Sequence, residues 1–445
     1  MDIGSLQLNS VRELKKFSNR LKEKKINTGS SAYTFIATWG DNLGFEFLKY
    51  KILKFSNILN FVKILFKDFY FAFTTDSIEI INKFEINKKN KIIFSNASLT
   101  DFRSDGSYTD RYFKINSKFY NEYIFIIIYT DKDIPNQIDS NLILLRRKKT
   151  FFLKNFFLFI IKSLNFILLK RQFSFFNYSG ASKFGEKLIF SLENNIDFKS
   201  ITKIFFPYEG ITFQQQLCLF SKNINPKINI IGYDHSAPHA NPLNLLYREG
   251  SPDLLFVNGK SQKNYLINYL DWPSEKIKIV PSLRYKNNSK EKFENTIFFP
   301  WKISNSKIII DNLTNLLENI KTNYLGNLKV KIHPVCADMK KQLRLKKEIE
   351  ILLAKHESKL NNVKNKTSIF IGSTTSVIVA LEKNLNVYHI CFDPIFDSYS
   401  DKMWPELKVE KITNNTFKYF LSKKNNFINF GEDEKIFDKY YNVDL

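Results

Sequence analysis

Short apolar runs rich in β-branched and aromatic residues alternate with helix-length amphipathic stretches along most of this chain, and this alternation strongly restricts its fold. YTFIATWG at residues 33–40 ends in a glycine and precedes a helical spacing, and later runs such as KIFFP, INIIG and LLFV follow the same order. Strands separated by helices of this length form mainly parallel sheets whose faces the helices cover. The sequence therefore predicts an α/β protein with doubly wound, Rossmann-like sheets.

A polar, charged stretch, KNNSKEKFEN at residues 286–295, has no apolar period and divides the alternation into two parts. At 445 residues the chain exceeds what one hydrophobic core usually organises, so we expect two domains. We predict an N-terminal domain over residues 1–285, a C-terminal domain over 296–410, and a helical tail over 411–445 that crosses back over the junction. Two such sheets would face each other across a cleft with the carboxyl ends of their strands, where ligands bind.

A run of hydroxyl residues, Ser373 to Ser376, follows the apolar run SIFI and Gly372 and leads into the helical pattern VIVALEKN. Hydroxyl side chains at a helix start bind its free N–H groups, and the same N–H groups bind phosphate. Capping requires only one hydroxyl, so four in a row favour a phosphate site that includes Ser373, Thr374, Thr375 and Ser376. Because the GK[ST] of a P-loop is missing, the pattern does not indicate an NTPase.

His333 and Pro334 follow the apolar run LKVKI, and the proline restricts the backbone of the histidine before it. An imidazole at this place can donate a hydrogen bond to a phosphate or stabilise a leaving group. A single histidine is more often a structural residue. Its place one strand and one helix before Gly372 nevertheless favours a shared site.

Glu209 interrupts the apolar pattern after KIFFP, between Tyr208 and Gly210. Burial raises the pKa of a carboxyl group, which would suit Glu209 to take a proton from a substrate hydroxyl. The alternative is that Glu209 caps the helix predicted from ITFQQQ. The spacing is compatible with both interpretations.

The next strand ends in GYDHSAPH, which contains Asp234, His235 and His239. Two imidazoles and a carboxylate raise the question of a metal, but the histidines do not share a helix face and further ligands are missing. We expect these residues, and Arg284 in the later SLRY, to contact substrate rather than a metal. Asp131–Asp133 matches an Asp-x-Asp metal pattern, but such triplets are common by chance in a chain rich in lysine and aspartate.

Basic residues exceed acidic ones by 67 to 44, which gives a net charge of +23. This charge suits an anionic membrane surface or anionic sugars. An AT-rich genome also produces a chain rich in Lys, Asn, Ile, Phe and Tyr, without selection for a ligand. No zinc knuckle, RNP-like strand or Gly-rich RNA loop accompanies the charge, so we do not expect nucleic acid as a partner.

Residues 146–171 combine basic ends with the apolar run FFLKNFFLFIIKSLNFILL. Lys154 and Lys162 would be costly at the middle of a bilayer, so we do not expect a membrane span. A basic amphipathic helix on an anionic leaflet and a helix buried between the two halves of the protein both fit. The N-terminus lacks the apolar core of a signal peptide, and no metal-ligand spacing relates Cys218, Cys336 and Cys391. We therefore expect a cytoplasmic protein, peripheral on the inner face of the cytoplasmic membrane if the amphipathic helix forms.

Glu209–Gly210, His333–Pro334 and the Ser373–Ser376 run, in this order, resemble the D/E-D/G, HP and SS motifs of bacterial polysialyltransferases and related enzymes that use CMP-activated nonulosonic acids. The segments YEG, GYDHSAPH, PDLLFVNGKSQ, IKIVPSLRY and the earlier Asp110–Phe113 also resemble a group of bacterial capsule and lipopolysaccharide biosynthesis proteins. The chain departs from the pattern in two places. It has threonines at 374 and 375 where the family more often has serines, and it has Tyr208 rather than a second acid beside Glu209.

The resemblance implies a GT-B fold and metal-independent, inverting transfer of a sialic-acid-like sugar from a CMP-activated donor to a surface glycan or glycolipid. It implies that Glu209 is the general base, that His333, Pro334 and the turn at residues 372–376 hold the CMP phosphate, and that no cofactor is needed. Asp234, His235, His239 and Arg284 would contact acceptor or donor. Three alternatives remain: a CMP-Kdo transferase, a CDP-glycerol-type phosphotransferase, which shares the HP and Ser-Ser motifs, and a noncatalytic glycan-binding or membrane-surface assembly protein.

Overall fold

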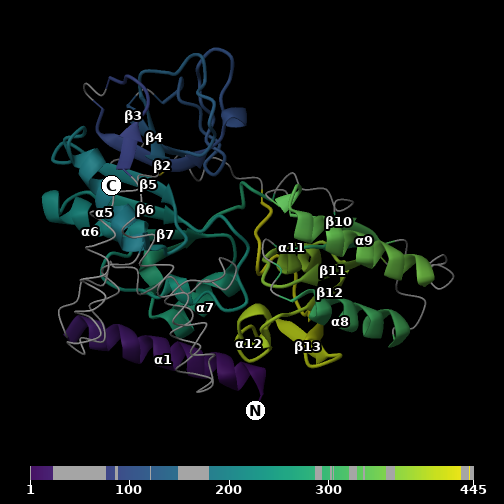
Figure 1. Ribbon diagram of the computed structural model, residues 1–445. Helices are drawn as coiled ribbons and strands as arrows, with labels where there is room; N and C mark the ends of the chain where they lie inside the picture. The colour runs from purple at the N-terminus through teal and green to yellow at the C-terminus, as the bar shows by residue number, and fades with distance from the viewer. Residues whose placement is uncertain are drawn as a thin grey trace, which may run out of the picture.

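The computed structural model describes two α/β sheets that lie in separate lobes (Figure 1). The described residues are 2–23, 77–85, 89–120, 122–148, 180–285, 293–300, 303, 305–319, 328–333, 336–356, 366–431 and 440. The strand expected at 33–40, most of the 286–295 connection and Pro334 lie outside them. Within them, no helix is both long enough and apolar enough to cross a membrane.

The larger sheet has eight strands in the order β1-β4-β3-β2-β5-β6-β7-β8. Only β1 pairs antiparallel, with β4, and all other neighbouring pairs are parallel. From β2 onward this is the doubly wound order in which the chain moves outward, returns to the centre and continues the other way. The strands are β1 (Ser77–Ile80), β2 (Lys91–Ala97), β3 (Tyr123–Tyr129), β4 (Leu142–Lys148), β5 (Lys203–Pro207), β6 (Asn229–Tyr233), β7 (Leu254–Val257) and β8 (Ile277–Ile279).

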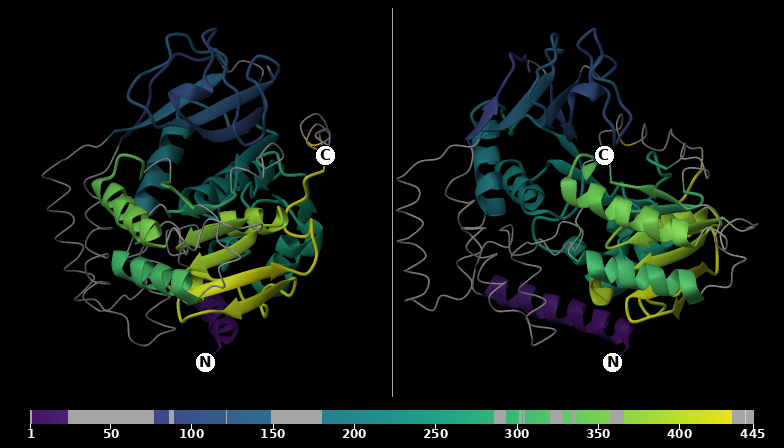
Figure 2. Two further views of the ribbon diagram at one scale, coloured as in Figure 1. Left: turned by 90° about the vertical axis from the view of Figure 1, so that its right-hand side faces the viewer. Right: turned by 45° about the vertical axis from the view of Figure 1, so that its right-hand side comes forward.

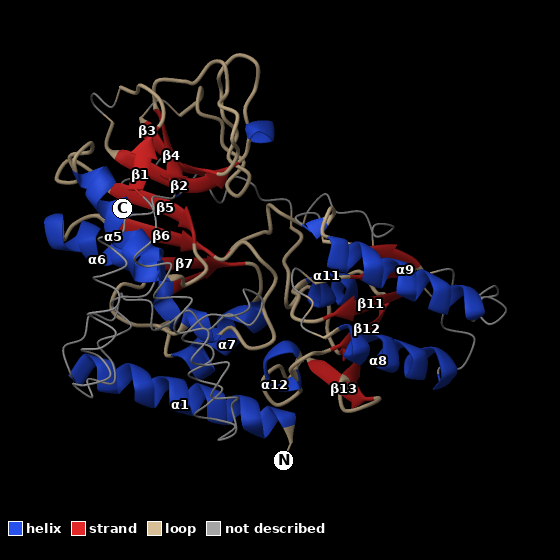
Figure 3. Ribbon diagram, viewed as in Figure 1, coloured by secondary structure: helices blue, strands red, loops and turns tan. Residues whose placement is uncertain are grey.

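Alternate residues of the central strands enter two different cores. Ile204 and Phe206 of β5 pack in the core formed with α5 (Gly180–Glu193) and α6 (Thr212–Ile224), whereas Phe205 faces the core formed with the segment around Tyr108 and Phe113. Figure 3 shows α5 and α6 together beside these strands. A strand covered on both faces consists of apolar residues without alternation, which explains runs such as KIFFP. The remaining helical segments of this lobe are η3 (Leu99–Asp101), η5 (Leu243–Leu245), α7 (Lys260–Leu270) and η6 (Ser274–Lys276).

The smaller sheet has six strands in the order β10-β9-β11-β12-β14-β13, of which the first four are parallel. Two helices, α8 and α9, pack together on one face (Figure 2), and α11 packs on the other. The predicted α/β class with two doubly wound sheets is therefore confirmed. The elements are β9 (Thr296–Phe298), α8 (Ser306–Asn319), β10 (Lys329–Lys331), α9 (Lys340–Lys355), β11 (Thr367–Ile371), α11 (Ser376–Glu382), β12 (Asn386–Ile390), α12 (Pro394–Asp397), β13 (Leu407–Lys411) and β14 (Thr416–Leu421).

The N-terminal helix α1 (Ile3–Glu23) contacts both lobes (Figure 1). The Gln7 side chain donates hydrogen bonds to the carbonyls of Ile395 (3.0 Å) and Ser398 (2.7 Å) beside α12. One turn later, Ser10 Oγ accepts a 3.0 Å hydrogen bond from the amide of Asn241 in the larger lobe. α1 is therefore a brace across the junction between the lobes.

The prediction of a helical tail over 411–445 is wrong for its first part, because Thr416–Leu421 is strand β14. Phe417 and Tyr419 are buried, whereas Lys418 between them is half-buried and Phe420 after them is exposed, which fits the period of two of a strand rather than the 3.6 of a helix. The chain then returns to the larger lobe, where the N–H of Asn429 donates to the carbonyl of Asn258 (2.7 Å). Residues 432–439 and 441–445 lie outside the described part.

The basic cluster expected to start an amphipathic helix at 146 belongs to β4 instead. Arg146, Arg147 and Lys148 pair with Glu79, Ile78 and Ser77 of β1. The antiparallel edge pairing thus extends the strand past its apolar part, and the predicted segment cannot begin before residue 149. Residues 149–171 lie outside the described part of the chain.

Candidate functional site

The candidate site lies where the strand order of each sheet reverses. In the larger sheet the reversal falls between β2 and β5, and Glu209 comes two residues after the end of β5. In the smaller sheet it falls between β9 and β11, and Gly372 directly follows β11. Because doubly wound sheets bind ligands outside the carboxyl ends of their strands at such points, both motifs occupy ligand-binding positions of their sheets.

The backbone around Glu209 is held by two amide side chains. Gln214 Oε1 accepts the Glu209 N–H at 3.0 Å and the Ile211 N–H at 3.3 Å, and Asn244 Nδ2 donates to the Glu209 carbonyl at 2.6 Å. Gly210 has a φ of 62°, and a Cβ there would lie 2.2 Å from the Asn244 carbonyl oxygen, so this turn requires glycine. The side-chain oxygen that accepts N–H groups at the start of α6 belongs to Gln214 and not to Glu209. The Glu209 carboxylate is therefore available for another role.

The Glu209 carboxylate is partly open to solvent. Its side chain keeps 31% of its surface exposed although protein atoms surround it densely. Burial raises the pKa of Glu209 to about 7, and the Arg284 guanidinium acts in the opposite direction. Glu209 Oε1 lies 3.8 Å from His235 Nε2, which is near contact but longer than a hydrogen bond. The carboxyl group is therefore partly ionised at neutral pH and accessible to a ligand.

Asp234 is a second carboxyl group beside Glu209, and it is buried. Gln262 Nε2 donates to Asp234 Oδ2 at 2.6 Å, and Asn258 Nδ2 donates to the Asp234 carbonyl at 3.1 Å and to the Ser236 carbonyl at 2.8 Å. Burial, and then the charge of Glu209, raise the pKa of Asp234 well above its usual range. Asp234 therefore holds its proton more tightly than an exposed aspartate does.

His235 and His239, in the loop after β6, add two neutral imidazoles to the candidate site. Burial lowers the pKa of His235 to about 3 and that of His239 to about 4, and the Arg284 charge adds to both effects. His235 Nδ1 is buried and has no hydrogen-bond partner among the described residues. Among all residues that the structure describes, no group of three His, Cys, Asp or Glu side chains is placed to hold a metal ion.

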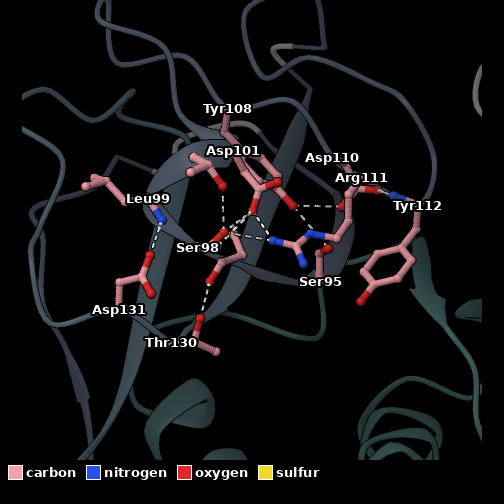
Figure 4. A network of polar contacts seen from close by, with 12 residues as sticks. Ser95, Ser98, Leu99, Asp101, Tyr108, Asp110, Arg111, Tyr112, Thr130 and Asp131 are labelled. Atoms are coloured by element: carbon pink, nitrogen blue, oxygen red, sulfur yellow. Dashed lines mark hydrogen bonds and ion pairs between the residues drawn. The ribbon is translucent and has the colours of Figure 1, made fainter. Parts of the chain in front are cut away.

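Tyr112 is a member of the site that the sequence analysis did not select. Its ring lies edge-on to the His235 imidazole with 4.5 Å between centroids, and burial, then the Glu209 charge, raise the pKa of Tyr112 to about 12. The buried Asp110 carboxylate forms the turn that presents it, accepting hydrogen bonds from the N–H groups of Tyr112 (2.8 Å) and Phe113 (2.6 Å) and from Tyr108 Oη (2.8 Å) (Figure 4). The Asp110–Phe113 motif was the sequence signal that could have identified Tyr112.

The Asp-x-Asp triplet, Asp131–Asp133, has a structural role near the ends of β2 and β3. Asp131 Oδ2 accepts the Leu99 N–H at 2.5 Å, and the Asp133 carbonyl accepts a hydrogen bond from Tyr129 Oη. Figure 4 shows Asp131 directed toward Leu99. These contacts stabilise the turns at the ends of β2 and β3.

In the smaller lobe, Gly372 makes the tight turn after β11. Its φ is 66°, and a Cβ there would lie 2.7 Å from the Phe392 ring. The Gly372 carbonyl lies 2.6 Å from Nε2 of the buried His389, and this hydrogen bond stabilises the turn. Glycine is therefore required here for conformation and for space.

The four hydroxyl residues after Gly372 are half-buried, and α11 begins at Ser376. Thr374 Oγ1 accepts the Ser376 N–H at 3.3 Å, which is a capping contact, while Thr375 at the N-cap position makes no side-chain cap. Part of this motif thus has the capping role that the sequence left open. Ser373 and Thr375 remain candidates for ligand contact.

Arg284 relates the two lobes electrostatically. Burial, and then the Arg284 charge, lower the pKa of His333, which comes two residues after the end of β10. The same charge opposes the rise in the pKa of Glu209.

Comparisons with known proteins concern the fold alone. No family model matches the chain, and no curated protein matches its sequence. The structure is similar to that of a glycosyltransferase from Rickettsia africae ESF-5, with 12% sequence identity, 67% of this chain and 78% of that chain covered, and a TM-score of 0.27. It is also similar to TarM from S. aureus, whose structure contains fondaparinux, α-GlcNAc-glycerol and UDP, with 14% identity, 55% and 49% covered, and a TM-score of 0.26. Both are distant likenesses to glycosyltransferases, and the functional argument rests on the residues of this chain.

Proposed function

We propose that this protein is a glycosyltransferase in which Glu209 removes the proton from the acceptor hydroxyl. The position of Glu209 carries this proposal: it lies at the switch point of the larger sheet, is partly exposed to solvent, and has a pKa of about 7. A general base is most effective when its pKa is close to the working pH. An ordinary surface glutamate would be too weak a base.

The reaction breaks the bond between the donor sugar and its phosphate and forms one between the sugar and the acceptor oxygen. The acceptor proton passes to Glu209, and the phosphate leaves with the electron pair of the broken bond. The neighbouring His235 imidazole, whose pKa burial lowers to about 3, adds no positive charge beside the base, and burial raises the pKa of Asp234. Burial is therefore the main factor that sets the pKa of Glu209.

We assign the donor to the class of CMP-activated nonulosonic acids, on the motif resemblance described above. His333, Pro334 and the turn at residues 372–376 would bind the departing CMP phosphate through an imidazole N–H, hydroxyl groups and backbone N–H groups. The acceptor would be a surface glycan or glycolipid. No metal ion or other cofactor takes part in the proposed reaction.

The test is the release of free CMP from CMP-sialic acid, CMP-Kdo and CDP-glycerol, each supplied with a range of glycan and glycolipid acceptors. We expect release from at least one donor, with E209Q reducing it by about 10²–10⁴-fold, the usual contribution of a general base. E249Q, a change of the exposed Glu249 in the same lobe, is the matched control and should retain full activity. A phosphodiester product from CDP-glycerol would identify a phosphotransferase, and no release from any donor would favour a noncatalytic binding protein.

A further inference from the structure

Arg284 is fixed over the site by its neighbours in the loop that follows β8. Arg284 Nη1 donates a 3.3 Å hydrogen bond to Ser236 Oγ, and its guanidinium lies 5.4 Å from the centre of the Tyr285 ring. Tyr285 Oη in turn accepts the Ala237 N–H at 3.2 Å. The loops after β6 and β8 thus hold each other, and Arg284 lies at their contact.

The guanidinium of Arg284 makes little use of its hydrogen-bonding capacity. It has five N–H donors, yet within the described residues it makes one long hydrogen bond and no carboxylate lies within ion-pair distance. Arg111 and Arg344, by contrast, form ion pairs with Asp101 and Glu348. An exposed arginine held in position without an anion is arranged to bind one.

The groups around Arg284 leave its charge uncompensated. Burial raises the pKa of Asp234 and leaves Glu209 only partly ionised at neutral pH, and the nearby imidazoles of His235, His239 and His333 are neutral. Little negative charge therefore balances the positive field of Arg284. This field attracts an anion to a place beside the Glu209 carboxyl group.

We propose that Arg284 binds an oxyanion of the substrate, a sugar carboxylate or a nucleotide phosphate, beside Glu209. The inference rests on the proposed function and adds to it a substrate class, because a neutral sugar on a neutral carrier would leave Arg284 unused. A planar guanidinium binds carboxylate or phosphate through two parallel hydrogen bonds, which also orients the ligand. Arg284 would thus be a specificity-determining residue.

Isothermal titration calorimetry of the full chain tests this with four probes: N-acetylneuraminic acid, its uncharged methyl ester, CMP and uncharged cytidine. We expect R284M to weaken one anionic probe by roughly 10- to 100-fold, the worth of a charge-assisted hydrogen bond, without affecting its neutral counterpart. A loss confined to the sugar acid identifies a carboxylate site, and a loss confined to CMP identifies a phosphate site. R284K should give an intermediate loss, because lysine keeps the charge but not the planar fork.

R344M is the matched control, since Arg344 is exposed on α9 in the other lobe and pairs only with Glu348 among the described residues. Its affinities should equal those of the wild type, and circular dichroism should show that all variants are folded. Equal binding of every probe by R284M and the wild type, an equal loss for charged and neutral probes, or no binding of either anion by the wild type would overturn the proposal. Because binding is measured without transfer, these outcomes are independent of whether E209Q retains activity.

Discussion

Transfer activity should rise with pH through a single ionisation near 7, because Glu209 acts as a base only when its carboxyl group is ionised. Three neighbouring groups do not ionise in this range. Burial raises the pKa of Tyr112 to about 12, and it lowers the pKa of His235 to about 3 and that of His239 to about 4. Glu209 has a pKa of about 7, and burial raises the pKa of its buried neighbour Asp234 as well.

The magnitude follows from the position of that pKa. At one pH unit below it, about one tenth of the carboxyl group is ionised, so kcat/KM at pH 6 should be about tenfold below its plateau. In R284M the pKa of Glu209 should rise further, because the opposing positive charge is lost. A charge near a partly solvated carboxyl group changes the free energy of its ionisation by about 0.7–1.4 kcal/mol, which corresponds to about half to one pH unit.

The assay is initial-rate CMP release between pH 5.5 and 8.5, with the acceptor below saturation so that kcat/KM reports on the free enzyme. R344M is again the control, and its profile should coincide with that of the wild type. A flat profile between pH 5.5 and 8.5, which a base with the usual carboxyl pKa near 4.5 would also give, would refute Glu209 as a base with a raised pKa. A limb that moves to lower pH in R284M would refute the role of Arg284 in its electrostatics.

Three further changes test the scaffold. Because the folded-state pKa of Glu209 is raised, the free energy of unfolding of the wild type should fall as pH rises from about 4.5 to 7, and E209Q should remove this fall. An equal pH dependence of this free energy in both proteins, measured by urea unfolding, would contradict the burial of the carboxyl group. G210A should lower the free energy of unfolding by about 1–3 kcal/mol, because its Cβ would clash with a carbonyl at positive φ, and an unchanged midpoint would show that the turn can relax. W404A should cost about 3–5 kcal/mol, since the indole is buried and stacked 4.4 Å from the Tyr265 ring; a loss below 1 kcal/mol would show that the lobes dock without it.

The sequence allowed the sheets to be predicted more readily than their ends. Strands covered on both faces, such as β5, are continuous apolar runs that differ clearly from amphipathic helices. β14 was missed because its alternation is short and lies in a stretch rich in Lys and Asn. The extension of β4 through Arg146 and Arg147 depends on pairing with β1, which is remote in sequence and has no local signal.

The positions of the candidate site residues followed from strand ends, but their surroundings did not. Whether Glu209 caps α6 depends on which side chain fills the cap, and the amide of Gln214 does so from within the helix. The approach of Tyr112 to His235 joins segments far apart in the chain, and so does the hydrogen bond from Gln262 to Asp234. Such contacts are set by the packing of the folded protein, and a single sequence carries no periodic pattern that reports them.

The contact between the lobes also determines the shape of the site. On either side of His239, the loop from β6 is held from the smaller lobe: Tyr399 Oη donates to the Pro238 carbonyl at 2.8 Å and Trp404 Nε1 donates to the Ala240 carbonyl at 2.8 Å. The returning C-terminal segment is fixed by the buried Glu382 carboxylate, which accepts the N–H groups of Asn425 (2.7 Å) and Phe427 (2.9 Å).

A movement of one lobe against the other would therefore displace the loop that carries Asp234, His235 and His239. With α1 bracing the same junction, we expect the arrangement of Glu209, Arg284 and His333 to be set when the lobes dock during folding rather than by a later closure around substrate. W404A should then lower kcat/KM even under conditions where the variant remains folded, because it loosens the backbone next to His239. The ends of the chain, which carry no catalytic group in the proposed reaction, thus hold the geometry on which that reaction depends.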